Sequence, residues 1–272
     1  MPDSYAALLD KVRETKPLVH HITNYVTVTD CANITLAIGA SPVMADSIGE
    51  AGDIAAIAGS AVLNMGTLNE FTIPSMIAAG KSANAKDIPV VFDPVGAGAS
   101  KLRNDTARRL ISEVKLSVLR GNISEIRFVA GLSSQTKGVD ASQSDLAGSG
   151  GAGMLAKELA GRLGCVVVIS GAVDAISDGK RIVLIENGHP MLGNLTGTGC
   201  MCSSLIGSFC AAVKDDPFAA AVAAMICMGI AGEIAFETAG RLGNGSFHMA
   251  LHDAVSLMDA PTFERMAKYR EA

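Results

Sequence analysis

The alternation of short apolar runs with segments of helical periodicity constrains the fold of this chain more than any other feature. Three runs, residues 61–66, 89–94 and 165–171, are apolar and end at glycine or proline. Runs of this length and composition are typical of fully buried strands. Because helical segments separate them, we predict an α/β fold with a largely parallel central sheet and helices on both faces.

The segments between these runs repeat apolar residues at helical spacing. We expect helices at residues 4–15, 29–38, 49–58, 104–119, 153–163, 199–213, 218–239 and 246–257. Residues 172–177 and 181–186 flank Asp178-Gly179, which is a strong hairpin signal. We therefore predict a hairpin near one edge of the sheet.

The chain reads as one domain over residues 1–272, since no internal repeat or proline-rich linker divides it. Its composition, 49% hydrophobic and 18% charged, is too apolar for a disordered chain and suits one large core. Residues 133–153 are polar and glycine-rich, which predicts a mobile surface loop rather than a domain boundary.

Charge and cysteine usage narrow the classes of partner. The net charge is only -5 and no run of like charges occurs, which disfavours nucleic acid or a membrane surface and favours a small ligand. Residues 1–16 lack a signal-peptide apolar region, and the six cysteines lack zinc or CxxC spacing, so we expect a cytoplasmic protein with reduced thiols. Residues 218–232 carry no charge but are too short for a membrane span, so we predict a buried helix.

Three motifs resemble functional sites but lack the context that such sites need. Residues 148–153 match the dinucleotide pattern GxGxxG, yet a polar loop and no strand precedes them. Gly80-Lys81-Ser82 resembles the end of a P-loop, although the segment looks mid-helical. His248 and His252 could share a helix face near Asp253, but no HExxH pattern or cysteine completes a metal site.

The sequence Thr196-Gly197-Thr198-Gly199-Cys200 stands directly before an apolar helical segment. Its glycines allow backbone N–H groups to converge at a helix N-terminus, where the partial positive charge favours anions. Such a site would stabilise the oxygens of a phosphoryl group during transfer. An ordinary glycine turn entering a helix remains the alternative interpretation.

Acidic and basic side chains follow two other apolar segments. Asp93 ends the apolar run at residues 89–94, and Glu125 follows Arg120 and Asn122. Two carboxylates suit a magnesium ion held partly through water, and Arg120 is available to neutralise phosphate oxygens. Each acid alone is also a common turn or cap residue.

Together these pieces resemble the ribokinase-like superfamily, whose marks are an aspartate after a central strand, an NxxE motif and a GxGD loop. Within it, the chain looks like the hydroxyethylthiazole kinase family over nearly its whole length. The segments that carry this resemblance are LVHHITN at 18–24, ASPVM at 40–44, LNMGT at 63–67, DPVGAG at 93–98 and TGTGC at 196–200.

The resemblance implies a three-layer α/β sandwich and a function. The expected reaction is ATP-dependent phosphorylation of the hydroxyl of 4-methyl-5-(2-hydroxyethyl)thiazole in thiamine salvage, with Mg²⁺ as cofactor. By similarity, the substrate pocket contains Asn24, Met44, Gly66 and Gly197, ATP contacts Arg120 and Ser170, the metal is managed by Asp93 and Glu125, and the backbone hole comes from Gly197 and Gly199.

Cys200 takes the place of the aspartate that accepts the substrate proton in most ribokinase-like enzymes. The helix N-terminus favours a thiolate there, and a loose transition state asks little of a base. The resemblance also implies a homotrimer with shared active sites, in which the Asn24 and Met44 segments meet the Cys200 loop of a neighbour.

Three other functions stay open on the sequence alone. A related kinase could act on hydroxymethylpyrimidine or pyridoxal, although Cys200 argues against an enzyme that uses aspartate. A nicotinamide-dependent oxidoreductase would depend on residues 148–153. A catalytically inactive binding protein would need neither the acids nor the loop glycines.

Overall fold

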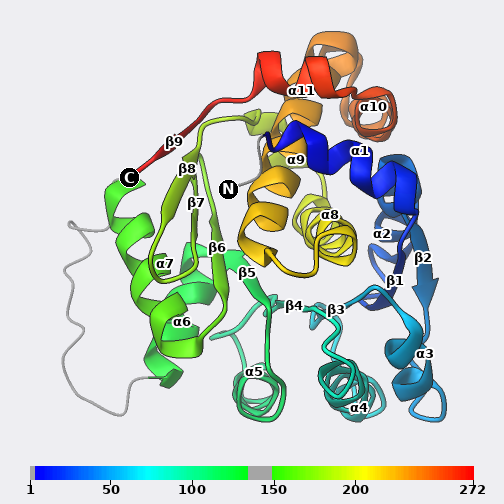
Figure 1. Ribbon diagram of the computed structural model, residues 1–272, viewed down its shortest axis with the longest axis vertical. Coiled ribbons are helices and arrows are strands. Elements are labelled where there is room, and N and C mark those ends of the chain that lie inside the picture. The colour runs from blue at the N-terminus through cyan, green and yellow to red at the C-terminus, as the bar shows by residue number, and fades with distance from the viewer. Residues whose placement is uncertain (1–3, 134–148) are drawn as a thin grey trace.

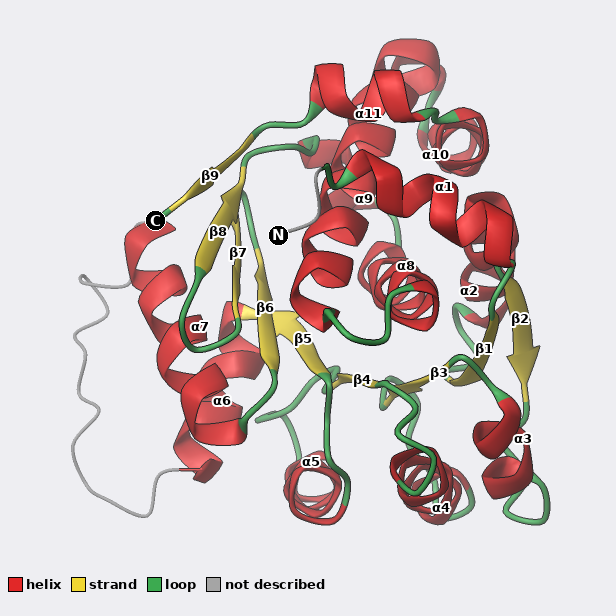
Figure 2. Cartoon of the chain, in the orientation of Figure 1, coloured by secondary structure: helices red, strands yellow, loops and turns green. Residues whose placement is uncertain are grey.

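A single nine-stranded sheet forms the centre of the molecule in this computed structural model, which describes residues 4–133 and 149–272. The strands lie in the order β2-β1-β3-β4-β5-β6-β7-β8-β9, parallel from β2 to β6 and antiparallel from β6 onward (Figure 2). Their bounds are β1 Leu18–Ile22, β2 Ser41–Met44, β3 Ser60–Asn64, β4 Val90–Asp93, β5 Val118–Asn122, β6 Val166–Ser170, β7 Asp174–Ser177, β8 Ile182–Ile185 and β9 Tyr269–Glu271.

Helices cover both faces of the sheet, as Figure 1 shows. One face carries α1 Ala6–Thr15, α2 Val28–Ile38, α8 Thr198–Ala212, α9 Pro217–Ala239, α10 Asn244–Leu257 and α11 Ala260–Met266. The other carries α3 Ala51–Ile57, α4 Thr72–Asn84, α5 Lys101–Glu113, α6 Ile123–Ser133 and α7 Ser149–Leu163. Short 3-10 turns, η1 Pro190–Asn194 and η2 Gly240–Leu242, precede α8 and follow α9. The expected three-layer α/β sandwich is confirmed.

The central strands are apolar throughout because both of their faces are buried. On β3, Val62 packs into the core under α8 and α9, whereas Leu63 packs into the core under α4 and α5. Val91 and Phe92 on β4 divide in the same way. Alternation along each strand therefore supplies two separate hydrophobic cores from one sheet.

The long apolar helix α9 belongs to the interior of the protein. It is long and apolar enough to cross a membrane, but 89% of its apolar window is buried within the fold. Asp216 caps its first turn by accepting a hydrogen bond from Ala219 N at 3.1 Å. The prediction of a buried helix is confirmed.

Most predicted elements are present, with one clear error. The three predicted strands correspond to β3, β4 and β6, and the hairpin corresponds to β7 and β8. The helix predicted at residues 104–119 instead ends at Glu113, and the strand β5 begins at Val118. Leu116 and Leu119 continue the helical spacing, but the extended backbone of Val114 ends the helix, and β5 then pairs with β4 and β6.

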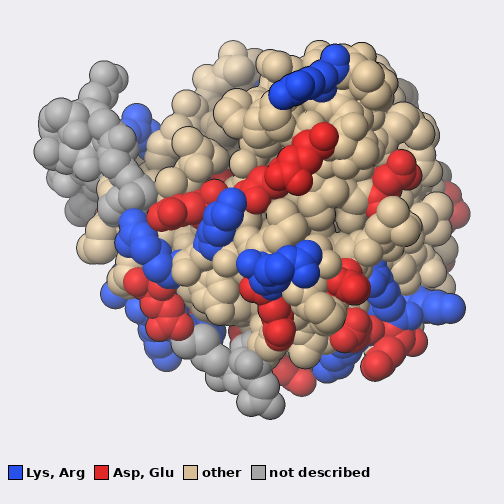
Figure 3. Space-filling model, turned by 90° about the horizontal axis from the view of Figure 1, so that it is seen from above, with Lys and Arg blue, Asp and Glu red and all other residues tan. Residues whose placement is uncertain are grey.

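The sequence reading did not predict strands β1, β2 and β9 or helices α4, α6 and α11 as elements. Much of the stretch predicted as a mobile loop, residues 134–148, lies outside the described residues, while residues 149–153 begin α7. On the face seen in Figure 3, lysine and arginine side chains lie among aspartates and glutamates, in keeping with the absence of a basic stripe in the sequence.

Candidate active site

Polar side chains collect at the carboxyl ends of the parallel strands. Asn64, Asp93 and Ser170 are the last residues of β3, β4 and β6, and Asn24 lies two residues after β1. Ligands of open α/β sheets bind at this edge because the strand ends and the loops after them leave a crevice there. Helix α8 begins at the same edge, since Ser203 and Cys200 contact Asp93 and Asn64.

The first turn of α8 is shaped by two glycines. Gly197 is the N-cap residue and has a φ of 90°, a conformation that side chains rarely adopt. A Cβ atom on Gly197 would lie 2.7 Å from Thr27 Cγ2, and one on Gly199 would lie 2.7 Å from Arg120 Nη1. The backbone of this turn can thus approach its neighbours and a ligand closely, as an anion site at a helix N-terminus requires.

Asp93 is fully buried at the end of β4. Its Oδ2 accepts hydrogen bonds from Ser203 Oγ at 2.7 Å and from Asn64 Nδ2 at 3.1 Å. Burial raises the pKa of Asp93 to about 6, although Arg120 and Ser203 oppose this shift. Its Oδ1 is buried and finds no hydrogen-bond partner among the described residues. Because a buried carboxylate oxygen normally has a partner, the Oδ1 of Asp93 is available to a donor or cation that binds with the substrates.

Arg120 spans the space between Asp93 and the end of β6. Its Nη2 donates to Ser170 Oγ at 2.9 Å, and its Nη1 lies 3.6 Å from Asp93 Oδ2, an ionic contact longer than a hydrogen bond. Its Nε is buried without a partner in the described part of the chain. A buried guanidinium with free donors beside Gly199 is well placed to meet phosphate oxygens.

Glu125 has a structural role that the sequence did not reveal. Its Oε1 accepts a hydrogen bond from Gly96 N and its Oε2 accepts one from Asn122 N, each at 2.8 Å. It sits in the first turn of α6, where Asn122 Oδ1 accepts from Ser124 N and Glu125 N at 3.0 Å. The carboxylate therefore fixes the loop after β4 to the start of α6. A metal ion could bind Glu125 only through the lone pairs that these two hydrogen bonds leave unused.

Cys200 lies at the centre of an amide cluster on the other side of the α8 turn. Asn24 Nδ2 and Asn64 Nδ2 lie 3.3 and 3.2 Å from Cys200 Sγ, in position to donate hydrogen bonds to it. Asn24 Oδ1 in turn accepts from Thr27 N at 3.1 Å. The sulfur of Cys200 is thus held between two amide donors at the edge of the sheet where Asp93 and Asn64 lie.

Asn64 was missed as a functional residue although it belongs to a quoted motif. Its amide links Asp93 and Cys200, and its Oδ1 accepts from Gly66 N at 2.9 Å and from Asn24 Nδ2 at 3.1 Å. The available signal was its position at the end of an apolar run, the same position that singled out Asp93. Ser203, which donates to Asp93, carried no such signal.

The predicted substrate residues are only partly brought together. Gly66 lies against Asn24, since a Cβ atom at Gly66 would stand 2.8 Å from the Asn24 side chain. Asn24 contacts Cys200 of its own chain, contrary to the expectation that its segment meets a neighbour's loop, because α8 packs against β1. Met44 is half-buried at the end of the edge strand β2, next to β1 rather than β3.

A cavity of about 470 Å³ opens on the Arg120 side of the α8 turn. Arg120, Ser170, Thr198 and Gly199 line it, which brings both predicted ATP contacts into one space of the size that cofactors occupy. Sequence reasoning missed several other lining residues, among them Asp174, Asn187, His189, Cys202 and Met228. Burial raises the pKa of Asp174 to about 6, although its Oδ1 accepts from Gly171 N at 2.9 Å.

The structure places the three motifs that lacked the context of a functional site in different surroundings. Gly80-Lys81-Ser82 lies inside α4, and Lys81 Nζ forms an ion pair with Glu113 at 2.6 Å, so it is no P-loop. Of the GxGxxG match, Gly148 lies outside the described residues and Ser149 already begins α7. His248 and His252 meet no cysteine among the described residues, but Asp30 from α2, rather than the neighbouring Asp253, lies beside both of them.

Comparisons with known proteins agree with one another. The model of the "Hydroxyethylthiazole kinase family" matches residues 9–260. Hydroxyethylthiazole kinases from Clostridium beijerinckii and Ruminiclostridium cellulolyticum are 60% and 59% identical, each over 97% of this chain and 96% of the relative. A solved hydroxyethylthiazole kinase protein from Pyrococcus horikoshii OT3 is 38% identical, with a TM-score of 0.90 over 98% of both chains.

More distant structures share only the fold. A pyridoxal kinase from Staphylococcus aureus in complex with ADP is 15% identical, with a TM-score of 0.59 over 80% of this chain and 88% of that one.

Proposed function

This chain belongs to the hydroxyethylthiazole kinase family, and we propose that phosphoryl transfer takes place at the first turn of α8. It is an ATP-dependent kinase of thiamine metabolism with a ribokinase-like fold. The observation that carries the proposal is the position of this turn. Gly199 faces Arg120 and the 470 Å³ cavity, while Cys200 faces the Asn24 and Asn64 amides.

ATP occupies the cavity in this proposal, with its γ-phosphate directed at the first turn of α8. Arg120 and Ser170 hold the phosphate oxygens, and the N–H groups at Gly197 to Cys200 meet the charge that spreads over the transferred group. The hydroxyl oxygen of the thiazole forms the new bond to phosphorus as the bond to the ADP oxygen breaks.

Cys200 receives the proton that the hydroxyl loses. Its sulfur is held by the Asn24 and Asn64 donors, which orient it on the substrate side of the turn. A Cβ atom at Gly66 or Gly197 would displace Asn24 or Thr27, so these two glycines keep the side chains around Cys200 in place for the ring and the alcohol. Met44 would add an apolar, polarizable wall to this pocket.

The carboxylates fit a magnesium ion through Asp93 more directly than through Glu125. Asp93 offers an unpartnered buried oxygen, whereas both oxygens of Glu125 already accept backbone N–H groups. Mg²⁺ prefers one or two carboxylates together with water and phosphate oxygens, so Asp93 would bind it and Glu125 would reach it through water. When bound, the ion would neutralise charge on the phosphates of ATP.

The oligomer and the setting are also part of the proposal. Tyr25, Val26, Ile48 and Phe71 are apolar and between 55% and 77% exposed, and they lie in the loops that follow β1, β2 and β3. A trimer that covers these side chains would close the substrate pocket from outside. The single sheet that both cores share supports one domain. The six free cysteines support a cytoplasmic location.

The test of this function is an ADP-release assay with hydroxyethylthiazole, hydroxymethylpyrimidine and pyridoxal in parallel. Turnover with the thiazole alone is expected. Arg120→Met should reduce it because phosphate oxygens lose their buried partner, whereas Arg108→Met, on the exposed face of α5, should leave it unchanged. Faster turnover of pyridoxal or of the pyrimidine would contradict the proposed substrate.

A further inference from the structure

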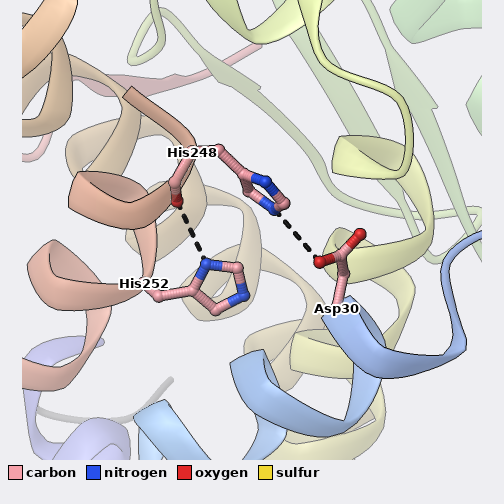
Figure 4. Close-up of side chains that lie close together, drawn as sticks. All are labelled: Asp30, His248 and His252. Atoms are coloured by element: carbon pink, nitrogen blue, oxygen red, sulfur yellow. Dashed lines mark hydrogen bonds and ion pairs between the residues drawn. The ribbon is translucent and has the colours of Figure 1, made fainter. Parts of the chain in front are cut away.

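Two histidines and an aspartate from distant parts of the chain meet outside the kinase site. His248 and His252 are one turn apart on α10, and Asp30 lies in the first turn of α2 (Figure 4). One ligand atom from each residue lies within 4.8 Å of the other two. His248 Nε2 stands 3.1 Å from Asp30 Oδ1, a short ionic contact that lacks the geometry of a hydrogen bond.

The hydrogen bond of His252 determines which of its nitrogens is available. Its Nδ1 lies 3.1 Å from the backbone oxygen of His248, and a carbonyl only accepts, so Nδ1 carries the proton (Figure 4). The neutral ring then presents a bare lone pair at Nε2. A histidine that ligates a metal is commonly held in this way, with its other nitrogen donating to a backbone carbonyl.

Both Nε2 atoms are buried and have no hydrogen-bond partner among the described residues. The residues His248 and His252 line a cavity of about 370 Å³ between α2 and α10, together with Asp30, Asn33 and Asp253. The ionic contact with Asp30 offsets the cost of burial for His248 Nε2, whereas the buried Nε2 of His252 has no such contact and is costly unless a ligand satisfies it. A carboxylate beside them supplies the negative charge that a cation needs.

From these observations we propose that Asp30, His248 and His252 bind a divalent transition-metal ion of the Zn²⁺ class. Two imidazoles and one carboxylate form a donor set that suits Zn²⁺, Co²⁺ or Ni²⁺ rather than Mg²⁺. Ligand atoms around a tetrahedral Zn²⁺ stand about 3.3 Å apart, so modest side-chain rotations would close the site. With three protein ligands, one position stays open to water or a small ligand.

The ion would connect α2 to α10 directly beside the catalytic loop. A Cβ atom on Gly197 would lie 3.5 Å from Asp30 Oδ2, so Asp30 belongs to the proposed site and also lies near the N-cap of α8. The site is separate from the carboxylates Asp93 and Glu125 in position and in chemistry. Its binding test needs no kinase activity, so the two proposals can fail independently.

Binding can be measured by titrating the untagged full-length protein with Co²⁺ and recording the visible absorption of the metal, with excess Mg²⁺ present throughout. Zn²⁺ competition then gives the affinity for Zn²⁺. His248→Gln, His252→Gln and Asp30→Asn should each weaken Co²⁺ binding by at least about tenfold. The matched controls are His189→Gln, outside the cluster, and Asp253→Asn, which lines the same cavity without belonging to the donor set.

Several outcomes would overturn the site. These are no saturable Co²⁺ absorption, equal binding by the controls and the three cluster variants, or the intense charge-transfer bands of a thiolate ligand. Melting curves without metal show whether each variant is folded. If His248→Gln lowers the melting temperature and metal has no effect on the parent protein, the cluster is only an ion pair.

Discussion

Cys200, which we propose as the proton acceptor, lies in surroundings that another acceptor could share. The sulfur accepts from two amides, Asn24 and Asn64, at 3.3 and 3.2 Å. The same two donors could serve a carboxylate without any change of partner, because carboxylate oxygens are stronger acceptors than a thiol. The surroundings of residue 200 are therefore already compatible with aspartate.

We expect Cys200→Asp to keep kcat or to raise it by up to about tenfold, since general bases contribute more when they are better acceptors. Steady-state ADP release measures this effect. Cys200→Ala, which removes the acceptor and leaves the two amides unpaired, is the control and should be slower than the parent. A Cys200→Asp variant that is well folded and inactive would show that Cys200 does not act as the base.

His21 couples the stability of the protein to pH. It is fully buried on β1, its Nδ1 lies 3.1 Å from Val19 O, and its Nε2 lies 3.1 Å from Ser204 Oγ on α8. Burial lowers the pKa of His21 from 6.5 to about 4. The unfolded chain therefore takes up a proton first as the pH falls, and stability present above pH 6.5 is lost between about 6.5 and 4.

At pH 5 this loss should amount to about 2 kcal/mol relative to pH 7.5. The test is urea unfolding of the parent and of His21→Gln at both pH values and one protein concentration. Asp93 and Asp174, whose raised pKa values of about 6 act in the opposite direction, are common to both proteins and cancel. Equal pH dependence of parent and variant would show that His21 is not the group responsible.

The site could be predicted where a residue type and a strand end coincide. Asp93 was found in this way, whereas the glycine loop was found from its place before a helix and Ser170 from the family resemblance, and the structure brings all three to one edge of the sheet. Asn64 and Asp30 were not found, since an amide or a carboxylate shows its partners only after distant segments meet. Glu125 was found as an acid, but its two backbone partners depend on the folded loop.

At the level of elements, the position of α8 depends on close packing against the sheet. Gly207 lies on the face of α8 that meets β1 and β3, and a Cβ atom there would collide with Val62 Cγ2 and lie 3.2 Å from Val19 Cγ1. The absence of a side chain at Gly207 thus allows the helix to approach the strands. The hydrogen bond from Ser203 to Asp93 then holds the first turn of α8, the proposed phosphate-binding turn, at the strand ends.

Gly207→Ala should destabilise the protein by about 1–3 kcal/mol, because an added methyl overpacks a filled core. Adding Val62→Ala should recover part of this loss, with a coupling energy of about 1 kcal/mol between the two changes. Denaturant unfolding of both single variants and the double variant measures the cycle. Gly161→Ala on α7, where a Cβ atom meets nothing within 4 Å, is the control and should be neutral or stabilising. Simple additivity of the two core changes would argue against close packing.

Elements were predictable where local pattern and tertiary pairing agree. The strand β4 has an unbroken apolar run and was found, whereas β1 contains His20 and His21 and was not. Both histidines are buried because they bond to Ala45 O and Ser204 Oγ, partners that lie 25 and 183 residues away. The misplaced end of α5 has the same origin, since pairing of β5 with β4 decides where the strand begins.

On the scale of the whole molecule, one group of exposed apolar side chains lies in the loops beside the proposed substrate pocket. Phe71 and Tyr25 are 75% and 77% exposed, and Tyr25 N donates to Thr67 Oγ1 at 3.3 Å, which joins the loops after β1 and β3. Met44 is the last residue of the edge strand β2, which pairs with β1 and not with β3. A second subunit laid over these loops would complete the pocket wall, so assembly and substrate affinity should change together.

Phe71→Asp tests this connection with little risk to the fold, since the side chain is exposed and stands at the N-cap of α4, where aspartate is favourable. A buried charge would weaken the proposed interface, so sedimentation velocity should show smaller species than for the parent at the same concentration, and KM for the thiazole should rise more than KM for ATP. Ile57→Asp is the matched control. Ile57 is 70% exposed, but it is the last residue of α3 and so precedes the amino-terminal end of β3, away from the loops that follow the strands. Two results would show that substrate binding does not depend on assembly. One is a parent protein that is monomeric and fully active, and the other is a Phe71→Asp variant that dissociates with both KM values unchanged.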